Sequence, residues 1–96
     1  MKNYIEIIRE IVVKELDDED VAIALFGSFA AGTNTEASDI DIAVIPKGKL
    51  KRWKLSLLRE KLEELTIPYV VDLVDFSIVS ESFKNTALTN VLWWRV

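Results

Sequence analysis

The sequence predicts a small α/β domain in which helices pack mainly on one face of a single β-sheet. Three observations predict it. Short apolar runs alternate with longer segments in which apolar residues recur at helical spacing. The chain has 96 residues, of which 50% are hydrophobic, and this suits one domain over residues 1–96 with a small core. The predicted order of elements is helix, strand, turn, strand, helix, strand, helix.

The first half of the chain predicts one helix and two strands. Residues 3–17 form an amphipathic helix, followed by an acidic run that we expect to be a solvated loop. Residues 21–26 are apolar and end at Gly27, which is typical of a buried strand. Residues 39–45 are rich in β-branched side chains and predict a second strand, stopped by Pro46. The expected apolar side of the first helix consists of Tyr4, Ile8, Ile11, Val12 and Leu16.

The second half predicts two more helices and a third strand. Residues 49–65 form an amphipathic helix, and residues 69–76 form the strand. Ser80 is placed to cap a last helix over roughly 81–89. The apolar tail, residues 91–96, fits either a strand or a helix end. The expected apolar stripe of the longer helix consists of Leu50, Trp53, Leu57, Leu58, Leu62 and Leu65.

The residue types that are missing narrow the chemistry. The chain has no cysteine and no histidine, which excludes disulfides, thiolate zinc sites, histidine general bases and Ser-His-Asp catalysis. Any catalysis must use carboxylates, hydroxyls, lysine, arginine or backbone groups. The net charge of −4 argues against non-specific binding of nucleic acid. Divalent cations stay attractive, because carboxylate oxygen is the ligand that Mg²⁺ prefers.

Nothing in the sequence predicts a membrane association. No apolar run approaches the roughly 18 residues that a membrane span needs. The N-terminal stretch carries acidic residues among its apolar ones, unlike a signal peptide. We therefore expect a cytoplasmic protein.

The strongest candidates for chemistry are aspartates on two strands. Alternate side chains of a strand share a face, so Asp39 and Asp41 point the same way, with Cα atoms roughly 6.5–7 Å apart. Two such carboxylates repel one another unless a cation such as Mg²⁺ lies between them. A third carboxylate, from the strand over 69–76, would complete a site for two metal ions that serves a phosphoryl displacement. That strand offers Asp72 and Asp75, which face opposite sides, and the pattern alone does not choose between them.

Gly27 and Ser28 directly follow the first strand and are the candidates for holding phosphate. Gly27 gives the turn conformational freedom and lets a ligand approach the backbone, and Ser28 adds a hydroxyl donor. Taken alone, a Gly-Ser pair is most often only a turn, and an Asp-x-Asp is often a pair of solvated acids. An acid inside an apolar strand is harder to dismiss, because buried acids are rare unless paired. Their joint occurrence favours a catalytic site.

At these residues the sequence resembles the minimal nucleotidyltransferases of the DNA polymerase β superfamily. The motif consists of Gly27-Ser28, ten residues, Asp39-Ile40-Asp41 and then the apolar strand YVVDLVDF with a further aspartate. The resemblance covers residues 20–85. It implies a mixed sheet flanked by helices, ATP or another nucleoside triphosphate as the donor, and two Mg²⁺ ions.

The resemblance also implies a role for each motif residue. Gly27 and Ser28 would bind the β- and γ-phosphates, and Asp39 and Asp41 would bind both metal ions. The third carboxylate of the family falls on Asp72, which would bind the catalytic metal and help deprotonate the acceptor hydroxyl. The other aspartate of that strand would then be structural or face solvent.

Chains as short as this one resemble members of the superfamily that are encoded beside HEPN-domain proteins as toxin–antitoxin pairs. That resemblance implies an antitoxin role, a helical HEPN toxin as the partner, and transfer of AMP to a tyrosine of it. Trp93 and Trp94 in the tail either belong to a surface for a partner or an oligomer, or they close a small core.

Two alternative functions stay open. One is a non-catalytic antitoxin-type module that neutralises a HEPN partner by complex formation. The other is an adenylyltransferase that acts on a small molecule such as an aminoglycoside, although no acceptor pocket is visible in so short a chain.

Overall fold

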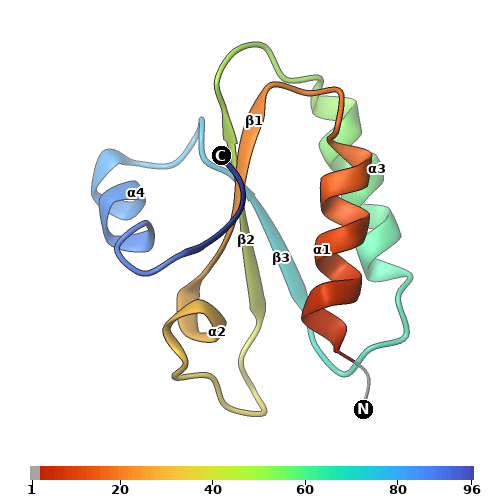
Figure 1. Ribbon diagram of the computed structural model, residues 1–96, viewed down its shortest axis with the longest axis vertical. Coiled ribbons are helices and arrows are strands. Elements are labelled where there is room, and N and C mark those ends of the chain that lie inside the picture. Colours follow the sequence, from red (N-terminus) through yellow and green to blue (C-terminus); the bar gives the residue numbers. More distant parts are fainter. Residues whose placement is uncertain (1–2) are drawn as a thin grey trace.

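The computed structural model describes residues 3–96, which form a four-stranded sheet and four helices (Figure 1). Every expected helix and strand is present, with ends that differ by a few residues. The tail forms a fourth strand, and the turn after the first strand contains a short helix. None of the helices over this range is long and apolar enough to cross a membrane. The elements are α1 (Tyr4–Glu15), β1 (Val21–Phe26), α2 (Gly27–Ala31), β2 (Ile40–Pro46), α3 (Arg52–Glu63), β3 (Val71–Asp75), α4 (Glu81–Ala87) and β4 (Leu92–Arg95).

The sheet is mixed, as the resemblance implies. Its strand order is β3-β2-β1-β4. β1 runs antiparallel to both β2 and β4, whereas β2 and β3 are parallel. β1 is therefore an inner strand, and all six of its residues are buried, which explains why its sequence is continuously apolar rather than alternating.

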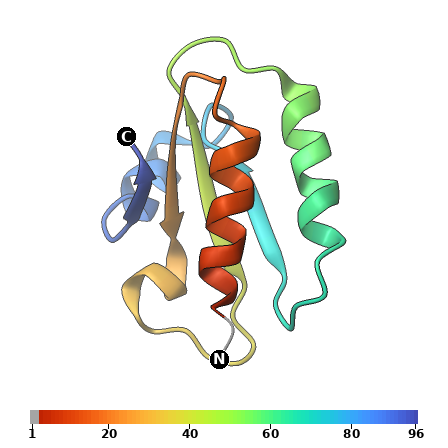
Figure 2. The same ribbon diagram turned by 45° about the vertical axis from the view of Figure 1, so that its right-hand side comes forward.

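The two longest helices, α1 and α3, cover one face of the sheet (Figures 1 and 2). This agrees with the expected arrangement, although α4 lies on the other face. Asn3 caps the start of α1, because its Oδ1 accepts a hydrogen bond from the Glu6 N–H at 3.1 Å. The core under these helices consists of Ile8, Val12, Leu16, Val21, Ile23, Leu25, Ile40, Ile42, Val44, Leu55, Leu58, Leu62 and Leu73.

The apolar stripe of α3 differs from the expected one. Leu58 and Leu62 are buried as expected, but Trp53 and Leu57 are 61% and 40% exposed. Leu55, which was not expected in the stripe, is buried. The reason is docking: α3 contacts β3 and α1, and the side that faces both runs through Leu55. Helical spacing fits either stripe, and only the packing partners select one.

The acidic loop after α1 is solvated only in part. Glu19 is 7% exposed, and its Oε1 accepts a hydrogen bond from the backbone N–H of Lys51 at 3.1 Å. Asp18 forms an ion pair with Lys54. The loop therefore anchors the start of α3 instead of only linking α1 to β1.

The opposite face of the sheet carries α4 and a cluster of phenylalanines. Ser80 caps α4 as expected, because its Oγ accepts a hydrogen bond from the Phe83 N–H at 3.1 Å. The rings of Phe26, Phe76 and Phe83 meet edge to face, with centroids 5.3, 5.8 and 6.2 Å apart. These contacts fix α4 beside the end of β1.

The two edges of the sheet are unlike. At the β3 edge, the carbonyl oxygen of Leu73 accepts hydrogen bonds from Arg59 Nε and Nη2, at 3.3 and 3.0 Å. At the β4 edge, Leu92 and Trp93 are 54% and 47% exposed. Trp94, by contrast, packs against the core. One tryptophan of the tail thus helps to close the core, and the other lies open to solvent.

Candidate active site

Asp41 and Asp72 lie next to one another on parallel strands. They are Cα partners in the register of β2 and β3, so their side chains point to the same face of the sheet. Asp39 lies directly before β2, two residues from Asp41, and is close enough for its charge to raise the pKa of Asp41. The face of Asp41 and Asp72 is the face of α4, because Ala43 and Val74, the next residues in the same alternation, pack in the phenylalanine cluster. The structure brings the three predicted aspartates to one end of this face.

Asp75, the aspartate that the pattern could not separate from Asp72, lies on the other face. It is 3% exposed. Arg52 Nη1 donates to its Oδ2 at 3.0 Å, and the Ser77 N–H and Oγ donate to its Oδ1 at 2.9 and 2.7 Å. Burial alone would raise the pKa of this carboxyl, but the Ser77 hydrogen bonds and the Arg52 charge outweigh burial and lower it. Asp75 is a structural residue.

Asp41 is in an unfavourable electrostatic position. Its pKa is raised, first by burial and then by the negative charges of Asp72 and Asp39. No salt bridge in residues 3–96 involves any of the three, whereas Asp75 and Asp18 both have a cationic partner. The three negative charges repel one another, and a bound cation would relieve this repulsion.

Gly27 lies directly against Asp41. It ends the strand pairing in which Phe26 is the Cα partner of Asp41, and its φ is +74°. A Cβ at this position would stand 2.2 Å from Asp41 Oδ2. The glycine is thus required twice, by the backbone conformation and by the close approach of the carboxylate.

Ser28 occupies the second position of α2, which begins at Gly27 without an interruption after β1. Both residues are half-buried. α2 ends at Gly32, which has a φ of +76° and is the left-handed C-cap of the helix. The short helix turns the chain back towards β2, where Asp39 and Asp41 follow.

The three aspartates fit a divalent cation by chemistry, but they are not a ready-made cage. Over the range that the structure describes, no three acidic side chains are grouped closely enough to hold a metal ion. Asp39 and Asp72 are exposed and Asp41 is half-buried, so two of the three carboxylates are free to change rotamer. An all-oxygen, triply negative donor set without a basic partner suits Mg²⁺.

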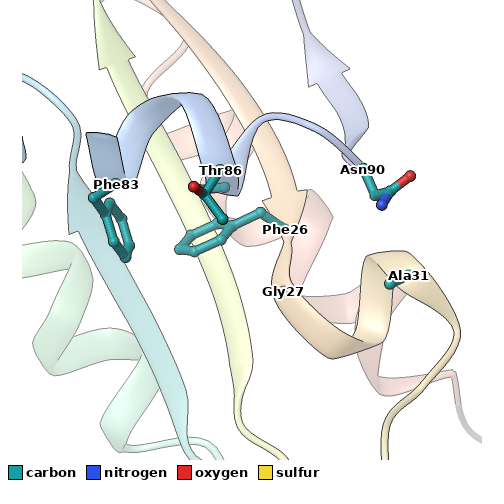
Figure 3. A pocket seen from close by; sticks show the side chains of 7 residues that line it. Phe26, Gly27, Ala31, Phe83, Thr86 and Asn90 are labelled. Atoms are coloured by element: carbon teal, nitrogen blue, oxygen red, sulfur yellow. The ribbon is translucent and has the colours of Figure 1, made fainter. Parts of the chain in front are cut away.

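A cavity of about 330 Å³ opens beside Gly27 (Figure 3). Phe83 and Thr86 enter its wall from α4, Asn90 from the segment before β4, and Ala31 from the end of α2. The sequence pattern predicts only a capped helix over residues 81–89 and gives no indication of this cavity. The local signal, a common helical side for Phe83, Thr86 and Ala87, does not say what that side faces. The lining consists of Phe26, Gly27, Ala31, Phe83, Thr86, Ala87 and Asn90.

Residues 6–93 match the model of the polymerase beta nucleotidyltransferase family. The chain belongs to this family. The match runs from α1 to β4 and therefore includes both faces of the sheet, all three aspartates and the Gly27–Ser28 bend.

One related protein and two chains of solved structures are similar to this chain. A probable protein adenylyltransferase MntA from Haemophilus influenzae is 34% identical over 66 residues, which are 69% of this chain and 58% of that protein. A chain of a toxin–antitoxin crystal structure with AMP-PNP matches with a TM-score of 0.68 and 31% identity, over 90% of this chain and 71% of that one. A chain of the complex of a tri-AMPylated Shewanella oneidensis HEPN toxin with an MNT antitoxin matches with a TM-score of 0.63 and 27% identity, over 93% and 70%.

Proposed function

We propose that this protein is a Mg²⁺-dependent nucleotidyltransferase that transfers AMP from ATP to a hydroxyl group of a HEPN-domain toxin, and so acts as its antitoxin. One observation carries the proposal: in a chain of the polymerase beta nucleotidyltransferase family, three aspartates without a basic partner share one face beside Gly27. The nucleotide and the acceptor are supported by relatives described as a probable protein adenylyltransferase and as part of a complex with an AMPylated HEPN toxin.

The residues divide into two groups in this proposal. Gly27 and Ser28 bind the β- and γ-phosphates through backbone N–H groups and the Ser28 hydroxyl. Asp39, Asp41 and Asp72 are the residues that would hold Mg²⁺. When bound, Mg²⁺ neutralises the carboxylates and the phosphates and so favours attack on phosphorus.

The reaction is a displacement at the α-phosphorus of ATP. The acceptor oxygen forms a bond to this phosphorus, and the bond from the phosphorus to the bridging oxygen of the β-phosphate breaks. Pyrophosphate leaves, and AMP stays on the acceptor. Asp72 is the more exposed of the paired carboxylates, and we assign it the hydroxyl proton. The remaining contribution of the protein is to position the groups and to offset their charge.

The proposal is tested with ATP labelled at the α-phosphate, MgCl₂ and a purified HEPN-domain protein encoded next to this chain. We expect label on the HEPN protein, loss of label with EDTA, and no label from ATP marked at the γ-phosphate. Asp39→Asn and Asp41→Asn should abolish transfer. Asp17→Asn, an exposed acid in the loop at the other end of the sheet, is the matched control and should transfer normally. Binding of ATP without any transfer of the α-label would refute the enzymatic role.

A second candidate is favoured by the β4 edge. Leu92 and Trp93 are exposed on an edge strand, which suits a binding module that neutralises a HEPN toxin by contact alone. The two candidates differ in their variants. If contact suffices, Asp41→Asn neutralises the toxin normally and Trp93→Ala does not; if catalysis is required, Asp41→Asn fails.

A further inference from the structure

We propose that the cavity beside Gly27 binds the base of the nucleotide, with Phe83 as the stacking surface and with Thr86 and Asn90 as the groups that select adenine. The inference rests on the proposed nucleotidyltransferase function. It adds where the base is held and which residues set the preference among nucleoside triphosphates.

The chemistry of the cavity matches a base rather than a phosphate or a charged acceptor. Its lining contains two phenylalanines, three small residues and two neutral polar residues, and none of the seven side chains is charged. Its volume of about 330 Å³ lies at the lower end of the roughly 300–1,000 Å³ typical of small-molecule sites. A flat, largely apolar group with a few hydrogen-bonding positions is the ligand that such a lining accepts.

The position of the cavity connects it to the rest of the site. Gly27 belongs both to the cavity wall and to the bend at which the phosphates are proposed to bind. It also lies against the carboxylate of Asp41. A nucleotide whose phosphates lie at Gly27 and Ser28 therefore has an adjoining space for its base between α2 and α4 (Figure 3).

Phe83 is held in a way that suits stacking. Its backbone N–H is fixed by the Ser80 cap, and its ring contacts the rings of Phe26 and Phe76 edge to face. The side chain nevertheless remains 44% exposed. A ring that is supported by its neighbours and still open to the cavity offers stacking area at a small loss of side-chain freedom.

Thr86 and Asn90 are the polar side chains of the lining, and both are exposed. In the described part of the chain, neither side chain hydrogen-bonds to another protein group, so both are free to bind a ligand. The Asn90 amide has a donor and an acceptor side by side. Adenine offers the matching pair at N6 and N7, whereas guanine offers two acceptors at the corresponding edge. The lining thus favours adenine.

The experiment is isothermal titration calorimetry of the full chain with MgCl₂ and four ligands: ATP, GTP, UTP and inorganic tripolyphosphate. Tripolyphosphate has the phosphates and lacks the nucleoside, so the ratio of its dissociation constant to that of ATP measures the joint contribution of ribose and base, and the variants below assign the part that the cavity supplies. We expect ATP to bind more tightly than GTP and UTP, and all three to bind more tightly than tripolyphosphate.

The variants assign this contribution to residues. Phe83→Ala should weaken the binding of ATP about 5- to 150-fold, which is the usual effect of removing one stacked aromatic side chain, and should leave the binding of tripolyphosphate unchanged. Phe83→Tyr should restore ATP binding, because the ring is kept. Asn90→Ala should reduce the preference of the protein for ATP over GTP without changing the binding of tripolyphosphate. Trp53→Ala, an exposed aromatic on the other side of the sheet, is the control and should change nothing. Circular dichroism checks that each variant is folded.

The outcomes separate the inference from the proposed function. If ATP and tripolyphosphate bind equally to the unaltered chain, or Phe83→Ala weakens both alike, the base does not lie in this cavity, while transfer of AMP can still be measured. If Phe83→Ala is unfolded, an unchanged ATP-to-GTP preference in Asn90→Ala overturns the inference instead. If neither ATP nor tripolyphosphate binds, the inference and the proposed function both fail.

Discussion

Gly27 and Asp41 are in direct contact: a Cβ on residue 27 would lie 2.2 Å from Asp41 Oδ2. The bend that is proposed to hold phosphate and the carboxylate that is proposed to hold metal therefore form one packed unit. Any side chain at residue 27 must displace the carboxylate of Asp41, because the added Cβ would also lie 3.1 Å from Asp41 Cγ and 3.4 Å from its Cβ. The contact explains why the Gly-Ser pair after β1 and Asp41 on β2 belong to a single motif.

Gly27→Ala should inactivate the protein more than it destabilises it. The positive φ costs about 1–3 kcal/mol of stability for a non-glycine residue. The displaced Asp41 should in addition lower AMP transfer by about 100-fold or more, since errors of 1 Å in a reacting site have effects of this size. Gly32→Ala is the matched control, because Gly32 has a similar φ of +76° and nothing within 4 Å of an added Cβ. It should lose stability only. Equal rates of transfer in the two variants would contradict the contact as the cause.

Asp41→Asn should abolish transfer and at the same time raise the melting temperature at pH 7 without Mg²⁺. The pKa of Asp41 is raised in the folded state by burial and by Asp72 and Asp39, so its ionised form destabilises the fold at neutral pH. As the pH falls through the folded-state pKa towards the unfolded value near 3.9, Asp41 becomes protonated, and the difference between variant and parent should shrink. Thermal melts at pH 7 and pH 3 measure this. A lower melting temperature at pH 7 would show that the carboxylate is stabilising.

Asp75→Asn should have the opposite dependence on pH. Because the folded-state pKa of Asp75 is lowered, its ionised form contributes stability above the unfolded value of about 3.9 and loses it as the pH falls through the folded-state pKa. We expect the free energy of unfolding of the variant to be about 1–3 kcal/mol lower at pH 7, because hydrogen bonds to a charged group usually contribute this much. Urea denaturation at pH 7 and pH 3 tests it. The deficit should be smaller at pH 3 than at pH 7, and a deficit of the same size at both pH values would mean that packing, and not charge, is responsible.

The two tail tryptophans should differ in their effect on stability. Trp94→Ala removes a side chain that packs against the core. It should lower the free energy of unfolding by about 2–4 kcal/mol, because the loss of a partly buried tryptophan costs somewhat less than the loss of a fully buried one. Trp93→Ala removes a side chain that is 47% exposed and should cost less than about 1 kcal/mol. Chemical denaturation of both variants gives the comparison. Similar losses would place both rings in the core.

The elements and the aspartate pair follow from local patterns, which is why the sequence predicts them. Strand alternation places Asp39 and Asp41 on one face, and this needs no knowledge of the fold. Whether Asp72 or Asp75 joins them depends on the register of β3 against β2, to which the flanking residues give no clue because both sides of that strand are apolar. The register places Asp72 level with Asp41, and the partners Arg52 and Ser77 account for Asp75.

Features that depend on how distant elements dock are the ones that local patterns miss. The stripe of α3 shifts to include Leu55 because the helix packs against both β3 and α1. The cavity beside Gly27 is formed by α2 and α4, which are separated by about half of the chain. Helical spacing reveals that Phe83 and Thr86 share a side, but only the tertiary arrangement places that side over the bend after β1.

The hydrogen bonds from Arg59 to the Leu73 carbonyl have a consequence for self-association. An extended peptide from another molecule would have to expel a guanidinium group before it could lengthen the sheet on the β3 side. Within residues 3–96, no side chain hydrogen-bonds to the backbone of Leu92 or Trp93 in the same way. A further strand should therefore be added at β4 and not at β3. Because only one edge of the sheet is open, two molecules that pair through β4 leave no open edge, which favours a closed pair of molecules over an open fibril.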